Sequence, residues 1–216
     1  MSNTDNFINE VTEEVRKDRV NALVRRYGWI AVVVVLAIVG SAAAWEWRAS
    51  QARSQAQSFG DGLLAALNSE DPGARLAALE SVPATGDAFA LRQLIAAAEI
   101  ANEDPAAAEG FLRAVMTDDS VSQRYRDLAT IRLVMVPDVP VLSSDRVALL
   151  EPLTVPGAPF RLTALEQKAL VHVERGETAL ALADLVILRD DVGASAAMRD
   201  RASQLIVALG GLPDES

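Results

Sequence analysis

The longest uninterrupted apolar run in the chain lies near its N-terminus. Residues 27–45 read YGWIAVVVVLAIVGSAAAW and contain no charged residue. A helix of this length rises about 1.5 Å per residue and so spans roughly the 30 Å hydrocarbon core of a bilayer. Aromatic rings that suit the headgroup level flank the run at Tyr27, Trp29, Trp45 and Trp47. The pattern predicts a membrane anchor, a single transmembrane helix over residues 27–47.

The segment before the span, residues 1–26, carries five basic and five acidic residues and is weakly amphipathic. Phe7, Val11 and Val15 fall near helical spacing, with charged residues mostly between them. A docking helix on the membrane face or on a partner and a solvated lead-in are both consistent with this pattern. Five basic residues that bear on topology lie here: Arg16, Lys17, Arg19, Arg25 and Arg26. Residues 1–26 are therefore predicted to be a cytoplasmic amphipathic segment.

The orientation of the span follows from the cations on its two sides. After the span, only Arg48 and Arg53 fall within about twenty residues. Because the cytoplasmic flank carries the excess of Lys and Arg, the N-terminus is expected in the cytoplasm. Residues 48–216 then lie outside it, in the periplasm if the source is a Gram-negative bacterium. The expected location is a bacterial inner (cell) membrane, crossed once.

A cleaved signal peptide is the rival interpretation of the same segment. Ile30–Val39 is a short apolar stretch, and Ala42-Ala43-Ala44 fits a small-residue cleavage site. The preceding segment carries five acidic residues, however, which is unlike a short basic leader. A cleaved protein would also not require the aromatic belt beyond the run. A retained anchor is the favoured alternative.

The composition and the residues typical of helix starts and stops predict an all-α domain after the span. Half of the residues are apolar but only 5% are aromatic, and the excess is Ala, Leu and Val. Asp71-Pro72 and Asp104-Pro105 have the form of a helix N-cap followed by its first residue, and Gly176 fits a C-terminal stop. Five prolines between residues 137 and 159 predict a loop-rich connection around one short helix at about 144–151.

Small and large apolar residues recur as they do in tetratricopeptide repeats, whose period is 34 residues. Gly176 is followed by Ala181 and Leu185, and the same pattern recurs 73 residues earlier, about two periods, at Ala108 and Leu112. A third, weaker copy has Ala74 and Ala78. Ala at a helix crossing lets two helices approach closely while Leu fills the groove. A tetratricopeptide-like α-solenoid is predicted, and an irregular helical bundle remains the alternative.

The ends of the chain carry two short motifs of a known family. The first runs Phe7-x3-Val-x-Glu-Glu-Val-Arg-x-x-Arg19 and continues through Leu23 and Tyr27-Gly28-Trp29; the second runs from Asp191 through Arg199, Arg201 and Ala202 to Ile206 and Leu209. With one span and weak helical repeats between them, the chain resembles the ancillary Sec translocon subunit family, also called the tetratricopeptide-like domain of a cell division coordinator. The resemblance implies a bacterial inner-membrane protein whose periplasmic repeats associate with the Sec translocon and a periplasmic chaperone.

The usual reactive residues are scarce. The chain has no cysteine, and His172 is its single histidine, so thiolate chemistry is excluded and most metal sites lack their ligands. No Asp, Glu or Ser lies four residues from His172, which favours a structural histidine. Paired aspartates at 118–119 and 190–191 lack the spacing of a calcium loop. Ser143-Ser144-Asp145 has no Gly-flanked elbow and is interpreted as a helix cap.

These exclusions favour a binding module that is not an enzyme and that has no catalytic residue, cofactor, metal or small-molecule substrate. The net charge of −10 argues against nucleic acid as a partner. The expected partners are the lipid bilayer and membrane proteins, either the Sec translocon with its periplasmic chaperone or another inner-membrane complex, such as a respiratory assembly, in which the chain is an accessory structural subunit. Arg124, Arg126 and Arg132, with Tyr125, either face a groove for a partner segment or are solvated.

Overall fold

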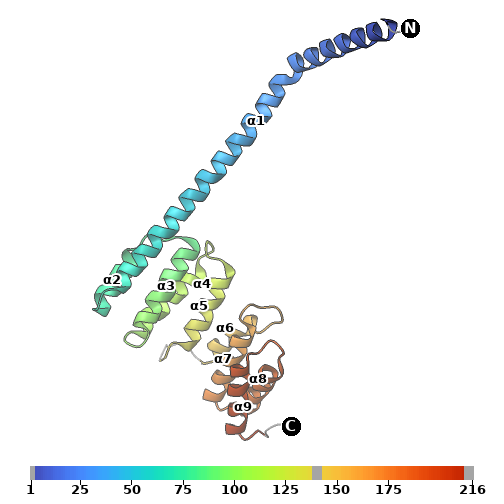
Figure 1. Cartoon of the computed structure of the whole chain (residues 1–216). Helices are drawn as coiled ribbons and strands as arrows, with labels where there is room; N and C mark the ends of the chain where they lie inside the picture. Colours follow the sequence, from blue (N-terminus) through green and yellow to red (C-terminus); the bar gives the residue numbers. More distant parts are fainter. Residues whose placement is uncertain (1–2, 138–142, 212–216) are drawn as a thin grey trace. The chain divides into compact units, whose positions relative to one another are not determined.

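The structure is a computed structural model that describes the backbone of residues 3–137 and 143–211 (Figure 1). Side chains are described for residues 29–30, 33–34, 36–137 and 145–211. The described residues form nine α-helices and one short 3-10 helix, with no strand among them. The all-α fold class predicted from the composition is therefore confirmed for this part of the chain.

The first helix, α1, runs without interruption from Asn3 to Leu67. A boundary between a span and a separate following helix is therefore not seen. Among the residues whose side chains are described, no helix combines the length and the apolar character needed to cross a membrane. Tyr27 and the basic residues at 16, 17, 19, 25 and 26 have side chains outside the described set. The chain divides into two compact units between Ser58 and Phe59.

The second unit contains the end of α1 and all later helices. Their bounds are α2 (Pro72–Ser81), α3 (Gly86–Ile100), α4 (Pro105–Thr117), α5 (Gln123–Met135), α6 (Ser143–Leu150), the 3-10 helix η1 (Glu151–Leu153), α7 (Arg161–Glu174), α8 (Thr178–Asp190) and α9 (Ala196–Ala208). The short helix expected in the proline-rich connection is confirmed as α6, because Pro152 and the residues after it interrupt regular helix.

Two Asp-Pro pairs begin helices in the predicted way. The Asp71 carboxylate accepts a hydrogen bond from the backbone N–H of Ala74 at 2.7 Å, and Asp104 accepts one from Ala107 at 2.9 Å. Each proline takes the first helical turn, where its missing N–H leaves no bond unmade. Both predicted starts, of α2 and of α4, are confirmed.

Removing one of these caps gives a direct test of the helix start. We expect Asp104→Ala to lower the free energy of unfolding by about 1 kcal/mol, because one backbone N–H of α4 loses its acceptor. Urea denaturation followed by circular dichroism measures the change. Asp119→Ala, at an exposed loop position, is the control and should leave stability nearly unchanged. Equal stability of the two variants would contradict the assigned cap.

The core is built from neighbouring helices packed in chain order. α3 packs on α4, α4 on α5, α7 on α8 and α8 on α9, while α5 contacts both α3 and α7. One cluster of buried side chains joins α3, α4 and α5 around Leu112, and another joins α7, α8 and α9 around Leu185. A third joins α5, α6 and α7 around Leu150. Helix α5 thus lies next to both α3 and α7.

Candidate functional site

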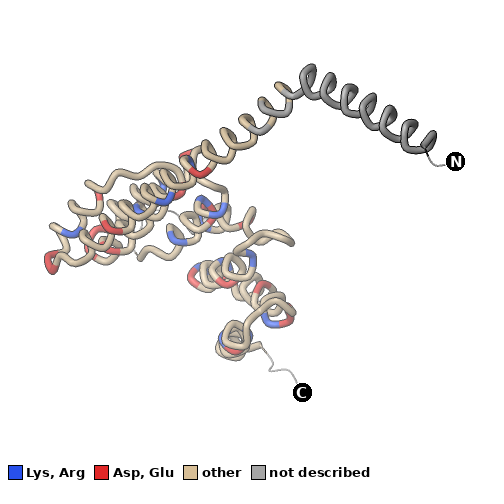
Figure 2. The backbone as a smooth tube through the Cα atoms, turned by 45° about the horizontal axis from the view of Figure 1, so that its top comes forward, with Lys and Arg blue, Asp and Glu red and all other residues tan. Residues whose placement is uncertain are grey.

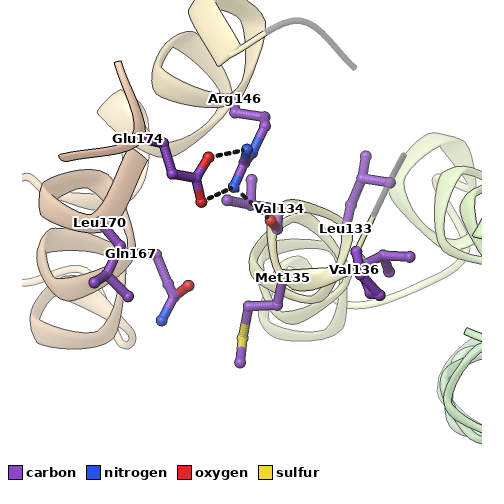
Figure 3. Close-up of a pocket in the computed structure, with 9 residues that line it drawn as sticks. Leu133, Val134, Met135, Val136, Arg146, Gln167, Leu170 and Glu174 are labelled. Carbon is purple, nitrogen blue, oxygen red and sulfur yellow. Dashed lines mark hydrogen bonds and ion pairs between the residues drawn. The ribbon is translucent and has the colours of Figure 1, made fainter. Parts of the chain in front are cut away.

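An open groove of about 660 Å³ lies between α5, α6 and α7 (Figure 3). Its walls combine apolar side chains of α5 and α7 with polar ones at the rim. The principal lining residues are Met135, Val136, Leu170, Arg146, Gln167 and Glu174. The Met135 side chain is 48% exposed, which is unusual for a methionine in a helical unit and leaves its flexible thioether free to contact another molecule.

One ion pair forms the polar rim of this groove. Arg146 reaches Glu174 through both terminal nitrogens, at 2.6 and 3.3 Å, and also donates to the carbonyl oxygen of Val134 at 3.2 Å. In Figure 3, the Arg146 guanidinium lies between Glu174 of α7 and Val134 of α5. The Arg146 Nε is buried without a hydrogen-bond partner among the described residues. Glu174 is half exposed, so the pair contributes little to stability and its carboxylate is accessible to a ligand.

A second groove, of about 240 Å³, lies on the other side of α5. It is lined by α3, α4 and α5, including Leu94, Ala98 and Arg132. Met135, Val136 and Pro137 line this groove as well as the first. The C-terminal end of α5 therefore lines two grooves, each with apolar walls and charged side chains at its edge.

A separate cluster of charged groups is buried between α7 and α8. The His172 Nδ1 lies 2.6 Å from Glu177 Oε2, and its Nε2 lies 3.7 Å from Asp184 Oδ2. Lys168 lies 3.6 Å from the other Asp184 oxygen and 3.1 Å from Glu151. His172 is thus a buried histidine held between two carboxylates.

Electrostatics within the cluster centre on Asp184. Burial raises the pKa of its carboxyl above the ordinary value, and the nearby Lys168 and His172 oppose that shift. The Asp184 Oδ2 has no hydrogen-bond partner among the described residues. His172 is only 5% exposed, so a substrate has no access to the imidazole. The arrangement suits a structural role that links α7 to α8, as the sequence favoured for His172.

Three of the residues predicted to pack the repeats lie in core clusters, namely Ala108, Leu112 and Leu185. Ala108 and Leu112 are buried in α4, and Ala181 and Leu185 are buried in α8. Gly176 ends α7 with a φ of +70°, a left-handed conformation that favours glycine. The third, weak copy is not packed in this way, because Ala74 is exposed and Leu79 is the buried residue of α2.

The arginines considered for the groove have different positions. Arg126 donates to the carbonyl oxygens of Asp118 and Val121, so it binds the loop before α5. Arg132 is exposed and lines the second groove, whereas Arg124 is exposed on α5 outside the lining of both grooves. Of these three arginines, only Arg132 therefore lines a groove that a partner segment could enter.

One aspartate of each pair at the helix ends is bound by a nearby backbone N–H. Asp118 accepts a hydrogen bond from the backbone N–H of Ser120, and Asp191 accepts one from Gly193 and also pairs with Arg161. The bond from Gly193 and the pairing with Arg161 lower the pKa of the Asp191 carboxyl. Within the described residues, no three acidic or histidine side chains are placed to hold a metal ion. The side chains of Ser143 and Ser144 lie outside the described set.

The positions of Asp184, Glu177 and the Arg146–Glu174 pair were not predicted from the sequence. Glu177 is five residues after His172, just beyond the next helical turn. Asp184 lies on another helix, α8, and contacts the same histidine from there. A charged residue at position 184, in the middle of an otherwise apolar helix, was the available signal.

Comparison with known proteins found no family model, no curated protein and no solved structure that matches this chain.

Proposed function

We propose that the chain is a membrane-anchored periplasmic module for protein–protein interaction, ancillary to the Sec translocon and its periplasmic chaperones, and that it is not an enzyme. The observation that carries the proposal is the pair of open grooves that share Met135, Val136 and Pro137. Helix α5 lines both grooves, with α6 and α7 completing one and α3 and α4 completing the other. In an α-solenoid, stacked helix pairs form grooves that bind extended segments of their partners.

The chemistry of the grooves indicates what kind of segment would bind. Apolar walls from α5 and α7 suit a segment with apolar side chains, and Met135 can adapt to several shapes. Arg132 on one side and the Arg146–Glu174 pair on the other would orient polar groups of that segment. Binding of this kind requires no reactive residue.

The anchor in this proposal is supported by apolar side chains along α1. Trp29 and Leu36 are each 65% exposed, and Trp45 is 76% exposed. Residues 29–45 of α1 include no charged residue, and those of them that Figure 2 colours are tan. Water-exposed apolar surface is unfavourable by about 25 cal/mol per Å², and contact with lipid removes that cost. The N-terminal flank, which holds five Lys and Arg residues, would then stay in the cytoplasm.

Site-specific photo-crosslinking in membranes tests the proposal. A photoreactive amino acid at Met135 of the full chain should capture a translocon subunit or a periplasmic chaperone. The same probe at Val155, which is 52% exposed but lies away from both grooves, is the matched control and should capture neither. Equal yields from the two positions, or no such protein from Met135, would count against the proposal.

The exposed apolar surface of α1 also favours a second candidate, an accessory structural subunit of another inner-membrane complex held mainly through its first 45 residues. Deletion of residues 1–45 separates the two functions, because the second compact unit begins only at Phe59. Continued binding of the partner by the truncated chain favours the groove. Complete loss of association favours the accessory subunit.

A further inference from the structure

Arginine side chains line three open grooves of the second unit, and they differ in their partners. Arg146, in the groove between α5, α6 and α7, pairs with Glu174. Arg161 lines a third groove, of about 360 Å³, at the start of α7, and it pairs with Asp191. Arg132 lines the groove between α3, α4 and α5, whose walls include no acidic side chain. Of these three arginines, only Arg132 lacks a carboxylate partner among the described residues.

The polar side chains of this groove are both available to a ligand. The chain has 30 acidic and 20 basic residues, so carboxylates are in excess. Arg132 is exposed near the C-terminal end of α5, yet it makes no ion pair and no hydrogen bond with another described residue. Asn102, which follows α3 and lines the same groove, is also exposed and has no hydrogen-bond partner among those residues. The counter-ion of Arg132 can therefore come from a bound molecule.

The remaining walls of this groove are apolar. Leu94 and Ala98 of α3, Leu112 of α4 and Met135 of α5 contribute to them. The groove volume of about 240 Å³ is below the range of about 300–1,000 Å³ that is typical of small-molecule and cofactor sites. A groove of this size suits one large apolar side chain of a peptide together with a neighbouring polar group.

We propose that this groove binds a partner segment in which an acidic residue lies next to a large apolar residue, with the carboxylate bound by Arg132 and Asn102. The inference rests on the proposed function, because it requires that the groove receives a peptide segment. It adds the chemical class of that segment.

Hydrogen-bond chemistry favours an acidic residue in the segment. The side chains of Arg132 and Asn102 both donate N–H groups, and an ionised carboxylate accepts hydrogen bonds only. A bond between a guanidinium and a carboxylate is charge-assisted and about twice as strong as a neutral one. A basic residue of the partner would instead meet the Arg132 guanidinium, and the walls hold no acidic side chain that would offset the repulsion. The groove therefore discriminates between acidic and basic segments.

A nucleic acid or an anionic membrane fits the same cation less well. Both present many negative charges close together, and proteins bind them through several Lys and Arg residues. Here Arg132 is the only basic residue of the lining, and the exposed Glu103 and Asp104 directly follow Asn102 in the chain. These two acidic residues would repel a row of phosphates. A single carboxylate in an otherwise apolar peptide segment is therefore favoured.

Selection from random peptides tests the proposal without a known partner. The full chain is immobilised in mild detergent and exposed to phage that display random linear peptides. These peptides are fused to the coat protein through their C-termini, so any carboxylate that is selected comes from a side chain. Selected peptides should share an Asp or Glu next to a Leu, Ile, Met or Phe. Arg132→Gln should remove the preference for the acidic residue. Arg124→Gln, on the same helix but outside both grooves, is the matched control and should retain it.

A double-mutant cycle then measures the contact itself. A fluorescent selected peptide, and its version with the acidic residue replaced by the corresponding amide, are titrated against the natural chain and Arg132→Gln by fluorescence anisotropy. Removal of either the guanidinium or the carboxylate should raise the dissociation constant about tenfold, because one charge-assisted contact is lost. Removal of both should cost little more than removal of one. Circular dichroism checks that Arg132→Gln stays folded.

The possible results separate this inference from the proposed function. Selected peptides without an acidic residue, or equal effects of Arg132→Gln and Arg124→Gln, would overturn the inference and leave the proposed function intact. Selection of no peptide by the natural chain would overturn both. Displacement of the selected peptide by decanoate at a comparable concentration would assign the groove to a fatty acid, and would overturn the inference as well.

Discussion

Replacement of Leu185 by alanine should lower the free energy of unfolding of the helical unit by about 3 kcal/mol. The Leu185 side chain is fully buried in α8, where it meets Ala169 of α7 and Ala202 of α9. The small residues that face it are already in close contact, so the surrounding helices can collapse only partly into the space left by the deleted methyl groups. The loss then includes a cavity term in addition to the lost transfer energy.

Chemical denaturation of Leu185→Ala and of a control variant at neutral pH measures this loss. Leu64→Ala is the matched control, because the same substitution at a side chain 64% exposed should change stability by less than about 0.5 kcal/mol. Leu112→Ala, in the separate cluster of α3, α4 and α5, should resemble Leu185→Ala. If Leu185→Ala were as stable as Leu64→Ala, the assigned packing of α8 between α7 and α9 would be wrong.

Local chemistry made parts of this fold predictable. The Asp104 cap and the Gly176 stop depend on atoms within four residues of each other, so their sequence patterns are sufficient. The small and large residues of α4 and α8 lie on the buried faces for a similar reason, since helical periodicity fixes which side chains share a face.

Contacts between helices were harder to predict from the sequence. The weak third copy of the repeat pattern placed Ala74 at a packing position, but α2 packs its Leu79 with Leu63 at the end of α1. The pairing of His172 with Asp184 joins residues on two helices, and a search restricted to positions four residues away missed it. Likewise, Arg146 and Glu174 are 28 residues apart and meet only because α6 packs on α7.

The buried charges between α7 and α8 lead to the second large effect. We expect Lys168→Met to destabilise the unit by about 3 kcal/mol, because the Lys168 ammonium is 3.6 Å from Asp184 and its removal leaves a buried carboxylate without that cation. Lys168→Met/Asp184→Leu should recover most of the loss, since a buried ion pair replaced by apolar side chains is often neutral in stability. Chemical denaturation of both variants at neutral pH measures the difference.

The pH dependence of stability gives this prediction a second readout. The folded-state pKa of Asp184 is raised above its ordinary 3.8, mainly by burial, so the folded state binds the proton more tightly than the unfolded state between the two values. The contribution of Asp184 to the free energy of unfolding is therefore highest on the acid side of that window, and it falls as pH rises through the window. Lys168→Met should steepen the fall, because the ammonium that opposes the shift is gone. Asp184→Asn should abolish this contribution, and identical pH profiles for Asp184→Asn and the natural chain would contradict the buried, ionised Asp184.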